Sequence, residues 1–88
     1  MTQRHKLTKL EVDLELYPVT WNECWDILAR HIDRAGTNAA LLDVFEWRYY
    51  EDDEEGYSIR EIAEYFGITY EAARQRCKQM LAVLREAL

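Results

Sequence analysis

Residues 58–88 have the sequence SIREIAEYFGITYEAARQRCKQMLAVLREAL, which predicts two helices joined by a tight turn. Ser58, followed three residues later by Glu61, has the pattern of a capping box, so we expect the first helix to begin there. Apolar residues then recur at helical spacing as far as Phe66. Gly67 follows at once and offers the left-handed conformation that a sharp turn requires. This stretch therefore predicts a helix-turn-helix.

The second helix of this motif has two faces of different chemistry. Thr69 can cap its start, and the pattern carries the helix from Tyr70 to about Leu88. An apolar stripe, expected to face the core, contains Ala73, Cys77, Met80, Leu81, Leu84 and Leu88. A polar stripe contains Tyr70, Glu71, Arg74, Gln75 and Lys78.

The polar stripe contains residue types that suit the reading of duplex DNA. A helix in the major groove presents side chains near its N-terminus to the base edges. Arginine can form two hydrogen bonds with guanine, glutamine can pair with adenine, and glutamate can accept from the cytosine amino group. We therefore expect Glu71, Arg74 and Gln75 to contact bases. The alternative interpretation is the solvated polar face of a packed helix, which describes most polar stripes.

The sequence around this motif is more specific than a general helix-turn-helix pattern. VFEWRY at 44–49 precedes SIREIAEYFGITYEAARQR at 58–76 and LAVLR at 81–85. The most specific part is the G-x-T-x-E-x-x-R-Q pattern that begins at Gly67. Together these segments resemble region four, the C-terminal DNA-binding region of bacterial sigma factors, over about residues 38–88.

The resemblance implies roles for individual residues. In the family, the residues that match Glu71, Arg74 and Gln75 read the upstream promoter element in the major groove, and region four also docks on RNA polymerase. Tyr70 stands where primary sigma factors commonly carry a basic residue, so we expect a different sequence preference. The expected supporting contacts with DNA are Thr69, Tyr70, Arg76 and Lys78.

The charge of the chain is unevenly distributed. The net charge is −6, and segments 1–42, 43–64 and 65–88 carry −1, −7 and +2. Weak binding to random DNA is expected unless the protein dimerises or acts beside a partner, because nonspecific affinity comes mainly from neutralised phosphates. The five acids at 51–55 are interpreted as a solvated loop. Alternatively, Asp52, Asp53 and Glu54 contact a basic protein surface, or the loop covers the basic helix when DNA is absent.

Residues 7–17 fit two interpretations. Leu10, Val12, Leu14 and Leu16 alternate with charged residues as in a half-buried strand, while Leu7, Leu10, Leu14 and Tyr17 fit a helix equally well. A lone strand would need a partner for its edges, such as the same segment of a second subunit in a homodimer. Pro18 is expected to end the segment.

Two further helices are expected before the helix-turn-helix. The first begins with a Thr20–Glu23 capping box, extends to about Ala35 and ends at Gly36. Ile27 lies off its apolar stripe and is a candidate for a contact with another protein. The second starts from a cap at 37 or 38 and extends to about Tyr50. The residues expected to face the core are Trp21, Cys24, Trp25, Leu28, Ile32, Leu41, Val44, Phe45 and Trp47 or Arg48.

The composition favours one small all-α domain over residues 1–88, with three to five helices. An apolar content of 49% and eleven aromatic residues indicate a packed core. No stretch approaches the roughly eighteen apolar residues of a membrane span, and no signal core follows the N-terminus, so a cytoplasmic protein is expected. Cys24 and Cys77 each lie on an apolar stripe and are expected to be buried thiols.

The sequence contains no catalytic set and no phosphate-binding glycine loop, so we expect neither an enzyme nor a bound metal or cofactor. The predicted function is a small transcription regulator that reads duplex DNA, of a size that would suit a phage or mobile element. The alternative is a protein-interaction module of the same fold that binds RNA polymerase or another regulator.

Overall fold

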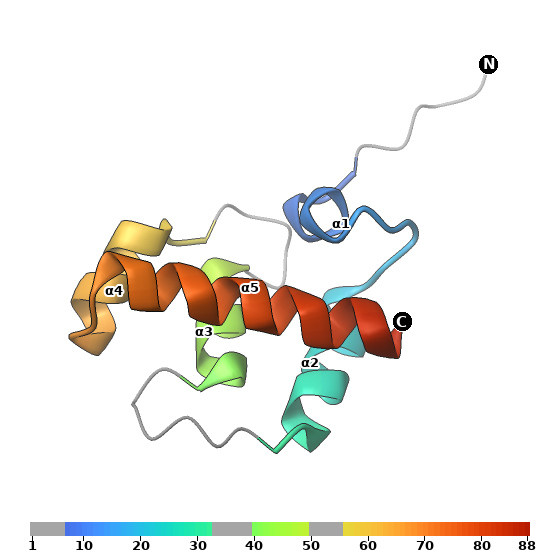
Figure 1. The fold of residues 1–88 in the computed structure, drawn as a ribbon. Helices are drawn as coiled ribbons and strands as arrows, with labels where there is room; N and C mark the ends of the chain where they lie inside the picture. The colour runs from blue at the N-terminus through green and yellow to red at the C-terminus, as the bar shows by residue number, and fades with distance from the viewer. Residues whose placement is uncertain (1–6, 33–39, 50–55) are drawn as a thin grey trace.

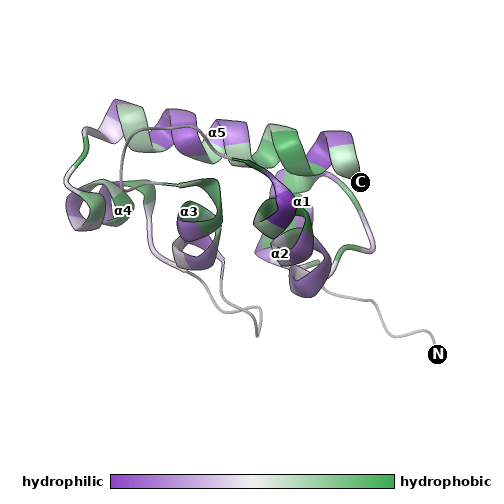
Figure 2. Ribbon diagram, turned by 90° about the horizontal axis from the view of Figure 1, so that it is seen from below, coloured by the Kyte–Doolittle hydropathy of each residue, from purple (hydrophilic) through white to green (hydrophobic). Residues whose placement is uncertain are grey.

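A computed structural model of the chain describes residues 7–32, 40–49 and 56–88, which form five helices and contain no strand (Figure 1). The predicted all-helical fold is therefore confirmed. The helices are α1 (Lys9–Leu14), α2 (Trp21–Arg30), α3 (Leu41–Arg48), α4 (Ile59–Phe66) and α5 (Tyr70–Ala87). The long helix α5 packs against each of the other four, which lie along one side of it (Figure 2). Within the described ranges, no helix has both the length and the apolar character needed to cross a bilayer.

The apolar stripe of α5 forms the centre of the core. Ala73, Cys77, Met80 and Leu84 are buried, as the helical spacing predicts, and Leu81 is partly buried. The predicted burial of Leu88 is wrong, because this residue follows the last turn of the helix and 44% of it is exposed. Side chains from the first three helices and from residues beside their ends pack around the C-terminal half of α5. The buried ones are Leu10, Leu14, Val19, Cys24, Leu28, Leu41, Phe45 and Tyr49.

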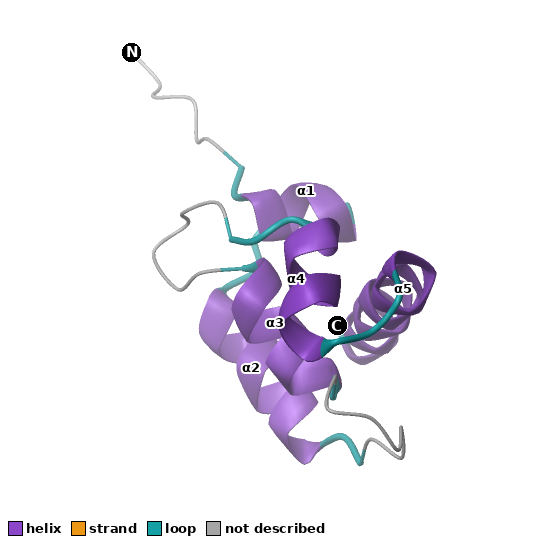
Figure 3. Cartoon of the chain, turned by 90° about the vertical axis from the view of Figure 1, so that its left-hand side faces the viewer, coloured by secondary structure: helices purple, strands orange, loops and turns teal. Residues whose placement is uncertain are grey.

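The predicted helix-turn-helix is formed by α4 and α5. The Ser58 hydroxyl accepts from the Glu61 N–H at 3.2 Å, and the Glu61 carboxylate accepts from the Ser58 N–H at 3.0 Å, which confirms the capping box. Gly67 follows α4 with φ 68° and ψ 35°, the predicted left-handed conformation. Ile68 is partly buried beside Phe66 and anchors the turn in the core. Figure 3 shows α4 and α5 on either side of this turn.

Replacing Gly67 with Ala should lower the free energy of unfolding by about 1–2 kcal/mol, the cost of a left-handed conformation for a residue with a Cβ. No neighbouring atom lies within 4 Å of the position that a Cβ would occupy, so the loss would come from the backbone alone. Urea denaturation followed by circular dichroism measures the change. Gly67→Asn is the control, since Asn tolerates this conformation better and should cost less. Equal stability of the Ala variant and the native protein would contradict the prediction.

Helix α3 is shorter than the sequence predicts. It begins at Leu41 after Ala40, which provides no side-chain cap, and it ends at Arg48 instead of about Tyr50. The proposed caps at 37 and 38 lie outside the described residues. Leu41, Val44 and Phe45 are buried as expected. Trp47 is partly buried and turns toward α4, where its ring packs against those of Tyr57, Tyr65 and Phe66.

Backbone contacts hold the end of α3 beside the start of α4. The Tyr57 N–H donates to the Trp47 carbonyl at 2.8 Å, and the Arg48 guanidinium donates to the Tyr57 carbonyl at 3.1 Å. A Cβ at Gly56 would lie 2.3 Å from the Arg48 carbonyl oxygen, so only glycine fits this approach. The acidic segment at 51–55 joins these two clamped ends, and Asp52, Asp53 and Glu54 lie outside the described residues.

The N-terminal segment is a helix, so the strand interpretation is wrong. The reason is a capping box that the alternating pattern conceals. The Thr8 hydroxyl accepts from the Glu11 N–H at 3.1 Å, and the Glu11 carboxylate accepts from the Thr8 N–H at 2.9 Å. The helix ends at Leu14, and Glu15 follows it with a left-handed φ of 59°, so Pro18 does not terminate it. Because this segment forms no strand, it gives no reason to expect a homodimer paired through strand edges.

Helix α1 is attached to the rest of the domain by apolar and polar contacts. Leu10 and Leu14 enter the core. The Arg85 guanidinium donates to the Asp13 carbonyl at 2.6 Å and, less closely, to the Leu14 carbonyl at 3.4 Å. It thereby satisfies carbonyls in the last turn of α1, which have no partner within the helix. The Tyr49 hydroxyl also donates to the Asp13 carboxylate at 2.6 Å.

Helix α2 has the predicted start but an earlier end. The Thr20 hydroxyl accepts from the Glu23 N–H at 3.1 Å, which is one of the two hydrogen bonds of the predicted capping box, and the helix stops at Arg30 instead of about Ala35. The predicted burial of Ile32 is wrong, because it lies beyond this end and 77% of it is exposed. The expected stop at Gly36 lies outside the described residues. Ile27, predicted to lie off the apolar stripe, is partly buried and packs against the main core.

Cys24 and Cys77 are both buried free thiols, as predicted. Burial, with a smaller contribution from the Glu23 charge, raises the pKa of Cys24 from 9.0 to about 12. Burial also raises the pKa values of Cys77 and Tyr49. All three groups therefore stay protonated in the folded protein at a pH where the unfolded chain loses these protons.

Stability should consequently fall as the pH rises above about 9. In that range the unfolded state binds fewer protons than the folded state, so the free energy of unfolding decreases with pH. Urea midpoints measured between about pH 7 and pH 11 test this expectation. Cys24→Ala should flatten the decline, because it removes one of the three shifted groups. A midpoint that is unchanged across this range would contradict the assignment.

Candidate nucleic-acid interface

The polar stripe occupies the exposed side of the N-terminal half of α5. Glu71, Gln75 and Lys78 follow one another at spacings of four and three residues, and all three are exposed. Buried Ala73 and Cys77 lie on the opposite side of the helix. The turn at 67–69 places this polar row at the start of α5, where a recognition helix carries its base-reading residues.

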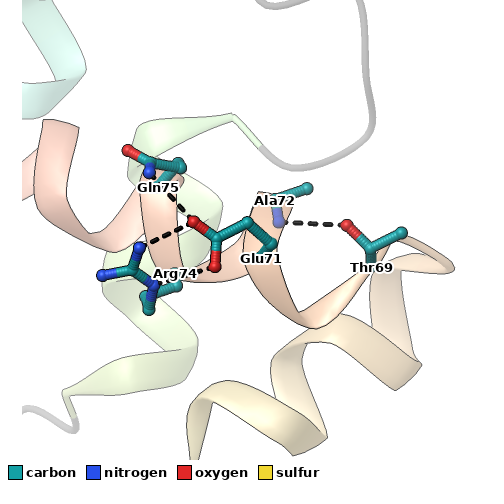
Figure 4. Close-up of polar contacts among 5 residues, drawn as sticks. All are labelled: Thr69, Glu71, Ala72, Arg74 and Gln75. Carbon is teal, nitrogen blue, oxygen red and sulfur yellow. Dashed lines mark hydrogen bonds and ion pairs between the residues drawn. The ribbon is translucent and has the colours of Figure 1, made fainter.

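The three predicted base-reading residues form one network (Figure 4). The Arg74 guanidinium donates to both oxygens of the Glu71 carboxylate, with distances of 2.6 Å from Nη2 and 3.0 Å from Nε. The Gln75 amide donates to the same carboxylate at 3.1 Å. Thr69 caps the helix by accepting from the Ala72 N–H at 3.0 Å. The structure thus brings Glu71, Arg74 and Gln75 together, with Glu71 at the centre.

The network changes the protonation of its members. Hydrogen bonds from Arg74 and Gln75, together with the charges of Arg74 and Lys78, lower the pKa of Glu71 from 4.5 to about 2. Glu71 is therefore ionised at every pH at which the protein is expected to work. The same pairing raises the pKa of Arg74. The Glu71–Arg74 pair has no net charge, so the positive charge of this half of α5 comes from Arg76 and Lys78.

The remaining predicted contacts lie apart from this network. Arg76 is two residues beyond Arg74 and therefore points about 200° away around the helix. Its guanidinium donates to the Gln79 amide oxygen at 2.7 Å. Tyr70 is the first residue of α5 and is 54% exposed. The structure therefore separates Arg76 from the Glu71-centred network, whereas Tyr70 lies beside it in sequence at the start of the helix.

The sequence interpretation missed the mutual pairing of the three residues predicted to read bases. The signal was present, because Glu71 lies three residues before Arg74 and four before Gln75, the spacings at which helical side chains meet. Among the described residues, His, Cys, Asp and Glu side chains do not form a group of three that could hold a metal ion.

Comparison with known proteins agrees with this geometry. The family model described as Sigma-70, region 4 matches residues 39–86, a range that contains α3, α4 and nearly all of α5. Searches of curated proteins and of solved structures gave no match. Sigma region 4 domains are DNA-binding helix-turn-helix domains that also bind RNA polymerase, and the family is one of DNA-binding regulators, not of enzymes. With more than half of its length matched, the chain belongs to the Sigma-70, region 4 family.

Proposed function

We propose that this protein is a transcription regulator that recognises a specific sequence in duplex DNA by inserting the start of α5 into the major groove. The observation that carries the proposal is the exposure of Glu71 and Gln75, with Arg74 beside them, on the helix that follows the turn. Buried α5 residues fix this helix against the other four, so the polar row is presented by a rigid element.

Each side chain has a role that follows from its chemistry. Arg74 donates to guanine, Gln75 pairs with adenine, and Glu71 accepts from the amino group of cytosine. Lys78 lies further along the same exposed row and contacts a phosphate. Thr69, Tyr70 and Arg76 supply further contacts with the DNA backbone on either side of the reading row.

The affinity for DNA of random sequence is expected to be low. The whole chain carries a net charge of −6, and segment 43–64 alone carries nine acidic and two basic residues. Phosphates repel such a segment, so a partner or a second DNA-bound copy would supply the remaining binding energy. Selection from a pool of random duplexes, followed by fluorescence anisotropy at several salt concentrations, tests the proposal. Failure to enrich any sequence at low salt would overturn it.

Arg74→Ala is expected to weaken binding to the selected duplex by about 1–3 kcal/mol, the typical discrimination of a bidentate contact with a base. Anisotropy with the selected and the random duplex measures the loss. Lys78→Ala is the matched control: removal of a phosphate contact should weaken binding to both duplexes similarly and reduce the salt slope by about 0.9. An unchanged affinity of the Arg74 variant for the selected duplex would remove the base-reading role.

A second function is favoured by the acidic segment at 51–55. As a protein-interaction module, the chain would bind a basic surface of RNA polymerase or another regulator through Asp52, Asp53 and Glu54. Replacing these residues with Asn, Asn and Gln separates the two functions. The DNA proposal expects stronger binding to random duplex, because phosphate repulsion falls. The protein-interaction proposal expects weaker capture of purified RNA polymerase.

We also propose that residues 1–88 form one domain. Helices α1 and α2 pack on α5 through the same apolar cluster that contains Phe45 of α3. A single urea transition, seen at the same midpoint by tryptophan fluorescence and circular dichroism, is the expected result.

A further inference from the structure

In the free protein, the Arg74 guanidinium is already paired with the Glu71 carboxylate. Its guanidinium forms two hydrogen bonds with the Glu71 carboxylate, at 2.6 and 3.0 Å, and Gln75 donates to the same carboxylate (Figure 4). A bidentate pair of this kind is the strongest geometry that an arginine and a carboxylate form. Two of the five guanidinium N–H groups are occupied in this way, so a contact of DNA with the same edge of Arg74 would replace bonds that the free protein already makes.

We infer that Glu71 is a specificity-determining residue that competes with DNA for Arg74 and Gln75, so that these side chains engage only a site that replaces the contacts of all three. This inference rests on the proposed function. It assigns to Glu71 a role in rejecting incorrect sequences in addition to its contact with cytosine.

A contact between Arg74 and a phosphate alone does not compensate for the hydrogen bonds that the network would lose. Arg74 could leave Glu71 for a phosphate oxygen, but the carboxylate would then lose both hydrogen bonds from Arg74, keep only the one from Gln75 and remain beside a polyanion. The ordinary pKa of a glutamate lies far below neutral pH, so Glu71 would stay ionised after losing Arg74 and would not relieve the repulsion by taking up a proton. The Glu71–Arg74 pair therefore contributes no net charge toward random DNA, and Lys78 and Arg76 act without its help.

A cognate DNA sequence would replace every hydrogen bond that the network loses. Guanine offers two acceptors to Arg74, adenine offers an acceptor and a donor to Gln75, and the cytosine amino group offers a donor to Glu71. A site that lacks the donor for Glu71 leaves a buried carboxylate unpaired in the groove, which is costly. The network thus penalises sites that satisfy Arg74 alone.

Glu71→Ala and Glu71→Gln test this inference, with anisotropy measured on the selected duplex and on a random duplex. Both variants should bind the random duplex more tightly than the native protein, with a salt slope steeper by about 0.9, because Arg74 becomes available to one more phosphate. The ratio of specific to random affinity should fall by about tenfold or more, the effect of losing one good base contact.

Two controls separate competition from a simple change of net charge. Glu64→Gln removes an exposed carboxylate of α4 and should raise random binding less than Glu71→Gln does. In an Arg74→Ala background, Glu71→Gln should affect random binding no more than Glu64→Gln does, because the side chain that it would release is gone. Equal effects of the two glutamate substitutions in the native background would overturn the inference.

The free protein supplies a readout that does not depend on DNA. Carboxyl-carbon NMR should show Glu71 titrating near pH 2, and Arg74→Ala should return its pKa toward the ordinary value for glutamate. An ordinary pKa in the native protein would overturn the inference, since Arg74 would not be held. A native protein that selects no duplex would overturn the proposed function and the inference with it. Selection by the native protein, with a random affinity unaffected by Glu71→Ala, would overturn the inference alone.

Discussion

Replacing Phe45 with Ala is expected to lower the free energy of unfolding by about 3–5 kcal/mol, the usual cost of removing a buried phenylalanine ring. Phe45 is fully buried in α3, and its ring lies 5.4 Å from that of Trp21 and 5.6 Å from that of Tyr49, centroid to centroid. The same cluster contains Met80 and Leu84 of α5. Its loss would therefore loosen the support of α5, the helix proposed to read DNA.

Urea denaturation monitored by circular dichroism measures this effect. A domain of this size has a total stability of about 5–15 kcal/mol, so the variant should lose a large share of it and unfold at a clearly lower urea concentration. Tyr70→Ala is the matched control, because it removes an aromatic ring that is 54% exposed and should change stability by less than about 0.5 kcal/mol. A loss below about 1 kcal/mol for Phe45→Ala would show that the cluster is not the centre of the fold.

Replacing Glu11 with Ala is expected to lower the free energy of unfolding by about 2–4 kcal/mol, because hydrogen bonds to a charged acceptor are strong and orphaned buried donors are costly. The Glu11 side chain accepts from the Thr8 N–H and from the Val19 N–H, both at 2.9 Å. Only 3% of the residue is exposed. The carboxylate thereby ties the start of α1 to the segment that leads into α2.

The same urea titration measures the loss, and Glu11→Gln separates hydrogen bonding from charge. The amide oxygen of Gln can still accept, so this variant should lie between Ala and the native protein. Glu23→Ala is the control, since it removes an exposed carboxylate from a comparable position in α2. If Glu11→Ala cost no more than this control, water would be satisfying the Thr8 and Val19 donors.

The prediction of the DNA-reading residues rested on local signals that can be recognised in a single sequence. The helix ends are marked by the Ser58–Glu61 capping box, by the left-handed Gly67 and by the Thr69 cap. Each of these signals involves residues at most three or four positions apart. The apolar stripe of α5 follows from helical periodicity alone. These signals predicted the boundaries of α4, the turn and the start of α5, and the Sigma-70, region 4 match covers the same segment.

The sequence was less informative where the decisive contacts join distant residues. The pattern of residues 7–17 fitted a strand and a helix equally well. Helix α2 ends at Arg30, whereas the sequence predicted an end at about Ala35. Helix α1 is stabilised where Arg85 donates to the Asp13 carbonyl and Tyr49 donates to the Asp13 carboxylate, across 72 and 36 residues of sequence. Local periodicity contains no information on such partners.

The sequence by itself determined the helix-turn-helix, its boundaries and the chemistry of its polar row, because capping and periodicity act over one or two helical turns. Only the tertiary structure decided that Leu10 and Glu11 are buried and that Arg85 caps α1. These outcomes depend on which surfaces dock, and docking is governed by the burial and hydrogen bonding of groups that lie far apart in the chain.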